Sequence, residues 1–226
     1  MKANEFIEKL KYVCDKCKTL YVMGCFGSPM TSTNKNRFTS NHVYNMSSNR
    51  RYLINKATSD TFGFDCVNLI KGIAWGWNGD KNKTHGGAKY CSNGVKDVSA
   101  DGMIALCKDV KRNDWDNILP GEAVWIKGHI GVYIGNGLVI ECSPKWKNCV
   151  QYTYLGNIKK YRKGNYRMWT KHGKLPFIDY GTVDLTNVAK DVIAGKYGNG
   201  DERKEKLKKA GYDYKEVQAV VNKLLK

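Results

Sequence analysis

One cysteine of the chain has the sequence setting of a nucleophile. Cys66 follows a Gly-Phe-Asp turn and begins an apolar segment, GFDCVNLIKGIAWGW, that predicts a helix. A helix N-terminus favours the thiolate form of a cysteine, and its peptide N–H groups can stabilise an oxyanion. The alternative is a buried core cysteine at a helix start, since the chain has eight cysteines.

A cysteine nucleophile also needs a base, and the chain has four histidines. His129 opens the segment HIGVYIG, whose composition predicts a strand, so its side chain would have a fixed direction. His42, His85 and His172 stand in polar sequence and are interpreted as surface histidines. We therefore predict that His129 is the base that activates Cys66.

Glu141 is the candidate for the group that orients the imidazole. If Gly135-Asn136-Gly137 forms a three-residue hairpin loop, Ile134 pairs with Leu138 and Glu141 lies on the same face as His129. A two-residue Asn-Gly turn would place them on opposite faces. The alternative for Glu141 is a solvated residue near the edge of a sheet.

The surrounding pattern predicts an α+β fold. A helix is expected to about residue 19, then a loop, the helix at Cys66, a long loop over 78–98, and a helix from Ser99 to about Val110. Short strands follow, separated by glycine, at 122–127, 129–134, 138–142, 150–154 and 166–170. A helical half before an antiparallel sheet is typical of the α+β class.

The last part of the chain predicts a separate small bundle of three helices. Its apolar spacing changes near 181–183, so we expect two domains, 1–180 and 184–226. The second is near the lower size limit for independent folding.

Composition restricts the partners. The formal net charge is +17, which favours a polyanionic partner such as an anionic cell wall. Nucleic acid is disfavoured because no DNA- or RNA-reading motif accompanies the charge. No apolar run is long enough for a membrane span, and Glu5, Lys9 and Lys11 interrupt the apolar residues that a signal peptide would need. We expect synthesis in the cytoplasm and action after release.

The remaining cysteines are interpreted as structural. Cys14 and Cys17 form a C-x-x-C, but both follow helical spacing with Phe6, Leu10 and Val13, which favours small core residues over a metal site. Free thiols are the expectation for a protein made in the cytosol, and no metal or organic cofactor is expected.

Two motifs together resemble a known family. GFDCVNLIKGI followed by GHIGVYIGNGLVIEC is similar to the NlpC-type (NlpC/P-sixty) cysteine peptidases of peptidoglycan, over roughly residues 5–170. The resemblance implies a papain-like core with Cys66, His129 and Glu141 as catalytic residues. It also implies substrate contacts by Tyr21, in the loop before the nucleophile, and by Asp65.

The chain departs from that family's pattern at three places. The Ser and Gly that follow the family's cysteine are Val67 and Asn68, which puts recognition of a free N-terminal alanine in doubt. The third catalytic residue is commonly His, Asn or Gln in relatives, and here it is Glu141. Residues 72–98 resemble an insertion to which the sequence assigns no task.

The C-terminal segment resembles a second module. IAGKYGNGDERKEKLKKAGYDYKEVQAVVNKLL is similar to the Cpl-seven repeat, a three-helix cell-wall-binding unit of phage lysins. The resemblance implies peptidoglycan binding, with Asp201 and Arg203 as candidate contacts. Alternatively, Asp201 caps a helix and Arg203 lies on its solvated face.

Together these patterns predict an endolysin-like peptidoglycan hydrolase that cleaves an amide bond in the stem peptide. It would reach the wall through a membrane hole made by another protein, or by a non-classical export route. N-acetylmuramoyl-L-alanine amidase activity is the alternative among hydrolases. A non-catalytic wall-binding protein and an acyltransferase of the same fold are the other readings.

Overall fold

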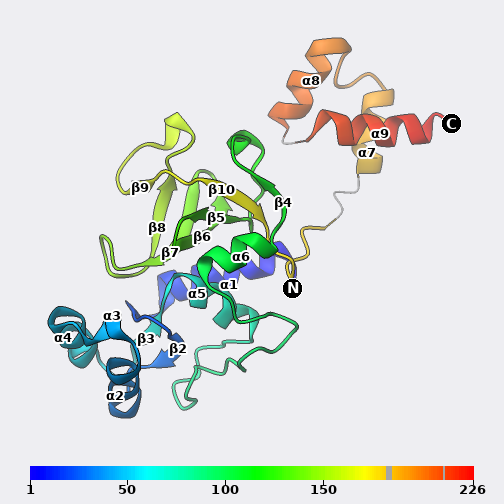
Figure 1. Cartoon of the computed structure of the whole chain (residues 1–226). Coiled ribbons are helices and arrows are strands. Elements are labelled where there is room, and N and C mark those ends of the chain that lie inside the picture. Colours follow the sequence, from blue (N-terminus) through cyan, green and yellow to red (C-terminus); the bar gives the residue numbers. More distant parts are fainter. Residues whose placement is uncertain (182–184, 211) are drawn as a thin grey trace. The chain divides into compact units, whose positions relative to one another are not determined.

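The computed structural model describes residues 1–181, 185–210 and 212–226. The chain divides into two compact units, Met1–Asp179 and Tyr180–Lys226 (Figure 1). The predicted domain boundary at 181–183 falls mostly outside the described residues. No helix in the described ranges has the length and apolar character needed to cross a membrane.

Two helices of the first unit cover the central strands of its larger sheet. Helix α1 (Ala3–Lys16) buries Phe6, Leu10 and Val13 completely, as the spacing of its apolar residues predicted. Helix α5 (Cys66–Ala74) is buried along its whole length. Both helices pack against strand β7, so the helix that begins at Cys66 lies in the core.

The larger sheet has seven strands in the order β4-β10-β5-β6-β7-β8-β9. Their bounds are β4 Lys108–Lys111, β5 Ala123–Ile126, β6 His129–Gly135, β7 Leu138–Ser143, β8 Cys149–Leu155, β9 Tyr166–Arg167 and β10 Lys171–Lys174. All neighbours are antiparallel except β8 and β9. The expected run of strands from β5 to β9 is confirmed, and β4 and β10 were not predicted.

A smaller sheet and three helices replace the loop expected after the first helix. Strands β1 (Thr19–Tyr21), β3 (Phe62–Phe64) and β2 (Phe26–Pro29) form the sheet in that order. Between β2 and β3 lie α2 (Ser32–Asn41), α3 (Val43–Met46) and α4 (Ser48–Lys56). Few of their residues are apolar and buried, mainly Phe38 and Ile54, which explains why the sequence shows no clear helical period.

Helix α6 is shorter than predicted. Ser99 caps it as expected, with its hydroxyl oxygen accepting the Gly102 N–H at 3.1 Å, but the helix ends at Leu106 and strand β4 follows. The preceding loop is anchored by two tryptophans, whose ring N–H groups donate to backbone carbonyls. Trp75 donates to Val95 at 2.8 Å and Trp77 to Gly27 at 3.0 Å. Single 3₁₀ turns lie at Trp115–Asn117 and Lys159–Tyr161.

The second unit consists of helices that pack on one another. They are α7 (Leu185–Ile193), α8 (Gly200–Lys209) and α9 (Tyr214–Leu224). Their shared core is formed by Leu185, Val188, Ala189, Val192, Leu207, Val217 and Val221. The predicted α+β class and the three C-terminal helices are thus confirmed.

Candidate active site

Asp65 fixes the start of helix α5 and holds a neighbouring loop. Its Oδ1 accepts the Asn68 backbone N–H at 2.8 Å, which makes it the helix cap. Its Oδ2 accepts the Asn68 side-chain amide at 2.7 Å and the Gly24 N–H at 2.8 Å. Burial raises the pKa of this carboxyl, although these hydrogen bonds oppose the rise. Asp65 therefore joins the helix that begins at Cys66 to the loop that follows Tyr21.

Cys66 lies at the first position of α5 and lines a cavity of about 400 Å³. Its side chain is 7 % exposed. Burial, assisted by the Asp65 carboxylate, raises the pKa of the thiol to about 12, whereas the backbone N–H groups of Ile130 and Val67 lower it. Burial thus outweighs the effect of the helix N-terminus, and Cys66 is a neutral thiol at neutral pH.

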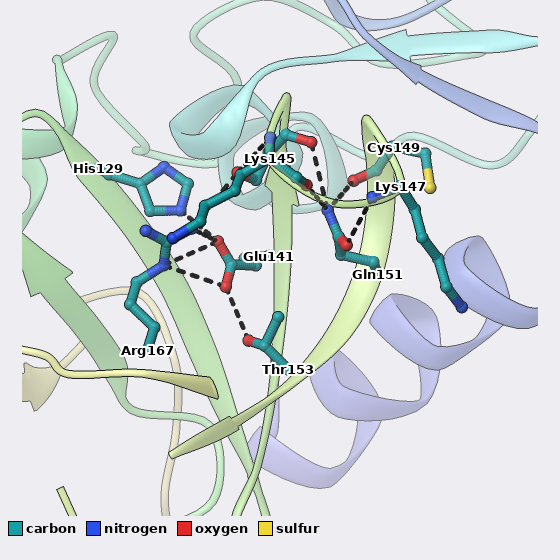
Figure 2. Close-up of polar contacts among 9 residues, drawn as sticks. His129, Glu141, Lys145, Lys147, Cys149, Gln151, Thr153 and Arg167 are labelled. Carbon is teal, nitrogen blue, oxygen red and sulfur yellow. Dashed lines mark hydrogen bonds and ion pairs between the residues drawn. The ribbon is translucent and has the colours of Figure 1, made fainter. Parts of the chain in front are cut away.

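His129 and Glu141 are joined by a hydrogen bond (Figure 2). His129 begins strand β6, and its Nε2 lies 2.5 Å from Oε2 of Glu141 on strand β7. Glu141 is fully buried. Burial alone would raise its pKa, but hydrogen bonds from His129 and Arg167 lower it below the usual value, so the carboxylate is ionised. An ionised carboxylate only accepts, so Nε2 carries the proton and Nδ1 is left as the acceptor of the ring.

The hairpin that aligns this pair differs from the prediction. Gly135 pairs with Leu138, so the turn has two residues, Asn136 and Gly137, and both have positive φ. Val132 nevertheless pairs with Ile140, because Ile134 forms a bulge that inserts one extra residue in β6. The predicted three-residue loop is wrong, but the bulge restores the same-face alignment that it was meant to explain.

Gly131 keeps the space between the two side chains open, as predicted. A Cβ atom there would lie 2.9 Å from Cγ1 of Val139 and 3.2 Å from Cβ of Glu141. A side chain at this position would therefore press on Glu141, which lies diagonal to His129 on the same face.

Two partners of Glu141 were missed in the sequence. Thr153 on β8 donates its hydroxyl to Oε1 at 2.7 Å, and Arg167 on β9 donates Nη2–H to Oε2 at 2.7 Å (Figure 2). Neither belongs to the motif around His129 and Glu141, because they lie 12 and 26 residues beyond Glu141. The only signal in the sequence was that a buried glutamate needs a positively charged partner.

Tyr21 lines the same cavity as Cys66. It is 5 % exposed, and burial together with Cys66 and Asp65 raises the pKa of its hydroxyl. Its ring meets Tyr44 edge to face, with centroids 5.8 Å apart, and Arg50 donates to its backbone carbonyl. Tyr21 therefore presents a fixed phenol to the cavity from the end of strand β1, and not from a loop as the resemblance implied.

The cavity lining also includes residues that the sequence did not assign. Lys71, buried on α5, donates to the Asp97 carboxylate and, at 2.9 Å, to the Val98 carbonyl. The 72–98 segment, for which no task was predicted, thus supplies a carboxylate to the cavity at its end. His42 also lines this cavity.

The interpretation of His172 as a surface residue is wrong. His172 lies on β10, is 1 % exposed, and its Nδ1 is 2.5 Å from Oε2 of Glu122. It lies on β10 between β4 and β5, and the Trp115 ring packs against it with centroids 4.8 Å apart, so it is buried despite polar neighbours in sequence. His85 is half-buried, bonds to Ser28 at 2.9 Å, and stacks on Phe26 with centroids 4.1 Å apart.

All eight cysteines are free thiols in the structure. Cys14 and Cys17 are half-buried, and burial is the main cause that raises the pKa of each. Both are therefore protonated in the free protein, which suits packing more than reactivity.

In the second unit, Asp201 and Arg203 have different surroundings. Asp201 lies in the first turn of α8, with its side chain 92 % exposed, and pairs with Lys204 at 2.8 Å. Arg203 donates to the Gly198 carbonyl at 3.0 Å, to Asn199 Oδ1 at 2.9 Å and to Gln218 Oε1 at 3.3 Å. Its guanidinium therefore links the turn before α8 to α9.

The comparisons with known proteins concern the C-terminal part of the chain. No curated protein matches the chain. Residues 186–225 match the CW_7 repeat, and the chain therefore carries a C-terminal cell-wall-binding repeat, as its sequence predicted.

Proposed function

We propose that this protein is an endolysin-like peptidoglycan hydrolase that cleaves an amide bond in the wall stem peptide. One observation carries the catalytic part of the proposal. His129, which pairs with Glu141, is the first residue of β6. The backbone N–H group of the next residue, Ile130, lowers the pKa of the Cys66 thiol. The cell-wall-binding repeat supplies the substrate class.

In the first half-reaction the Cys66 sulfur attacks the carbonyl carbon of the amide. Because burial favours the neutral thiol, the proton passes to Nδ1 of His129 as the bond forms. The N–H groups of Cys66 and Val67, in the first turn of α5, stabilise negative charge that develops beside them. The imidazolium then protonates the leaving amine, and a thioester remains on Cys66.

In the second half-reaction water hydrolyses the thioester. His129 takes a proton from the water, and the Cys66 thiol is restored when that proton returns to the sulfur. Throughout, Glu141 accepts the Nε2–H and stabilises the imidazolium. The steps are acid–base and nucleophilic, and side chains of this chain supply each group.

Tyr21 and Asp65 have complementary tasks in this proposal. Tyr21 presents its phenol to the substrate in the cavity. Asp65 already accepts three N–H groups, so it acts by fixing the loop that follows Tyr21 more than by direct binding. The basic surface favours adsorption to an anionic wall, and we propose that the enzyme acts there after release from the cytoplasm.

Product analysis of digested walls tests the proposal. Purified peptidoglycan is incubated with the protein and with the Cys66→Ala variant, and soluble products are identified by mass spectrometry. We expect new N-terminal amines within the stem peptide, formed only by the parent protein. Release of the whole stem indicates the amidase, and products from Cys66→Ala contradict the nucleophile.

A truncated chain separates cutting from binding. Each unit has its own core, so residues 1–179 should cleave a soluble stem peptide at the rate of the full chain. They should sediment less with intact walls. Wall binding without cleavage by the full chain would indicate a non-catalytic binding protein, and product that requires an added acyl acceptor would indicate a transferase.

A further inference from the structure

Arg167 contacts Glu141 from the side opposite to Thr153 (Figure 2). Its Nη2 lies 2.7 Å from Oε2, and its Nε lies 3.2 Å from both carboxylate oxygens. Oε2 is therefore shared between Arg167 and His129. Arg167 is a charged partner of the residue that orients the imidazole.

Two tryptophans hold the guanidinium in place. Its central carbon lies 5.0 Å from the ring centroid of Trp146 and 5.4 Å from that of Trp169. Trp169 also stacks on His129, with centroids 5.7 Å apart and planes 14° apart. Arg167 and His129 thus share both a carboxylate and an aromatic neighbour, which fixes their relative positions.

The protonation state of Glu141 determines which nitrogen of His129 carries the proton. An ionised carboxylate accepts from Nε2–H, and Nδ1 is then free to take a proton from Cys66. A protonated Glu141 would instead donate to Nε2, and the neutral ring would carry its proton on Nδ1. In that tautomer His129 could not act as a base toward Cys66.

Burial works against the ionised form, because Glu141 is fully buried. A neutral residue at this position would need no positive partner, whereas a glutamate does. Arg167 supplies this charge within hydrogen-bond distance of both oxygens.

We propose that Arg167 is a positioning residue of the proposed reaction, which keeps Glu141 ionised and thereby holds His129 in the tautomer that accepts the proton of Cys66. The inference rests on the proposed function for its catalytic meaning. The effect of Arg167 on the tautomer of His129 can be measured without turnover.

The first test therefore uses protein that cannot react. Cys66→Ala and Cys66→Ala/Arg167→Met, labelled with ¹⁵N-histidine, are compared by NMR from pH 5 to 9. In Cys66→Ala we expect neutral His129 to carry its proton on Nε2. In Cys66→Ala/Arg167→Met we expect the proton on Nδ1 at the acidic end of the pH range in which His129 is neutral. His172 is an internal control, since it pairs with Glu122. The same His129 tautomer in both proteins across this range would overturn the proposal.

The second test measures hydrolysis of a soluble stem peptide against pH. In Arg167→Met the acidic limb of the kcat profile should move to higher pH. At pH values below this limb, kcat should be lower than in the parent by about 10²-fold or more. Arg167→Lys should restore part of the activity. Arg162→Met is the matched control, because Arg162 donates to the Gly156 carbonyl and should leave the profile unchanged. An equal loss at every pH would overturn the proposal.

A double variant separates charge from packing. In Glu141→Gln the orienting group is neutral, so removal of Arg167 should have a smaller effect on kcat than it has in the parent. An undiminished effect would contradict the charge role. If the parent hydrolyses no wall peptide, the proposed function fails, while the tautomer measurement still decides the role of Arg167.

Discussion

Oε2 of Glu122 lies 2.5 Å from Nδ1 of His172, the same separation that joins Glu141 to His129 in the same sheet. The two pairs differ in their surroundings. His172 is enclosed, its ring centroid is 4.8 Å from that of Trp115, and its buried Nε2 has no hydrogen-bond partner in the described part of the chain. The His129 side chain, by contrast, is 14 % exposed, and the backbone N–H group of the next residue, Ile130, lowers the pKa of Cys66. We infer that this pair stabilises the fold.

Loss of the Glu122 carboxylate should lower stability without altering catalysis. Glu122→Ala leaves Nδ1 of buried His172 without its acceptor, at a cost of about 1–3 kcal/mol in the free energy of unfolding. Urea denaturation measures this change. Glu141→Gln is the contrasting variant, since it should reduce kcat more than Glu122→Ala does. A loss of kcat in folded Glu122→Ala would contradict the structural role.

The pKa of Cys66 predicts how its alkylation depends on pH. Burial raises this pKa to about 12, so the thiolate fraction, and with it the rate of reaction with iodoacetamide, should increase about tenfold per pH unit up to that region. Mass spectrometry of the peptide that contains Cys66 follows the alkylation rate. Alkylation of the exposed Cys91 in the same sample checks that the reagent is active. A plateau already reached near pH 6 would show a preformed thiolate–imidazolium pair and contradict the proton transfer proposed here.

The three hydrogen bonds of Asp65 predict the effect of its removal. Asp65→Ala deprives α5 of its cap and the Gly24 loop of its anchor, so we expect stability to fall by about 1–3 kcal/mol. Thermal unfolding measures the loss. KM for a soluble stem peptide should rise as well, because this loop follows Tyr21 and its residues Met23 and Gly24 line the cavity. If KM is unchanged in the folded variant, the link between this loop and substrate binding is wrong.

The sequence predicted those features of the site that depend on residues close together along the chain. The cap at Ser99, the helix at Cys66 and the short strands β6 and β7 are short-range signals, and each appears in the structure. The face shared by His129 and Glu141 was predicted, although for the wrong reason. A bulge at Ile134 cannot be read from residue types, since a three-residue loop gives the same alignment.

The partners of the site depend on long-range packing and were missed. Arg167 lies on a two-residue strand, too short for a periodic signal, and reaches Glu141 only because β9 follows β8 in the sheet. His172 was misjudged for a related reason. Its neighbours in sequence are polar, but it lies on β10 between β4 and β5, and the ring of Trp115 packs against it. Burial that neighbouring strands impose leaves little trace in the local sequence.

The close approach at Gly131 predicts that alanine is damaging there. The added Cβ would lie 2.9 Å from Cγ1 of Val139 and 3.2 Å from Cβ of Glu141, so both residues must shift. Overpacking of this kind costs about 1–3 kcal/mol in stability. Because Glu141 moves relative to His129, kcat should also fall. Thermal unfolding and hydrolysis of a soluble peptide measure both effects. Full activity in Gly131→Ala would contradict the dependence of the site on this spacing.

The contacts of Arg203 and Asp201 predict opposite effects in the cell-wall-binding repeat. Arg203 joins the turn at Gly198 to Gln218 on α9, so Arg203→Ala should lower the stability of this unit by about 1–2 kcal/mol. Exposed Asp201 pairs with Lys204, a neighbour on the same helix, so Asp201→Asn should leave the stability within about 0.5 kcal/mol.

Sedimentation with purified walls then distinguishes folding from recognition. If Asp201 contacts the ligand, Asp201→Asn weakens wall binding with no change in thermal unfolding. Arg203→Ala should weaken binding only in proportion to the fraction of the repeat that is unfolded, and Gln218→Ala, which removes one partner of Arg203, should give a smaller loss of the same kind. Weaker binding by fully folded Arg203→Ala would assign the guanidinium to the ligand instead of the turn.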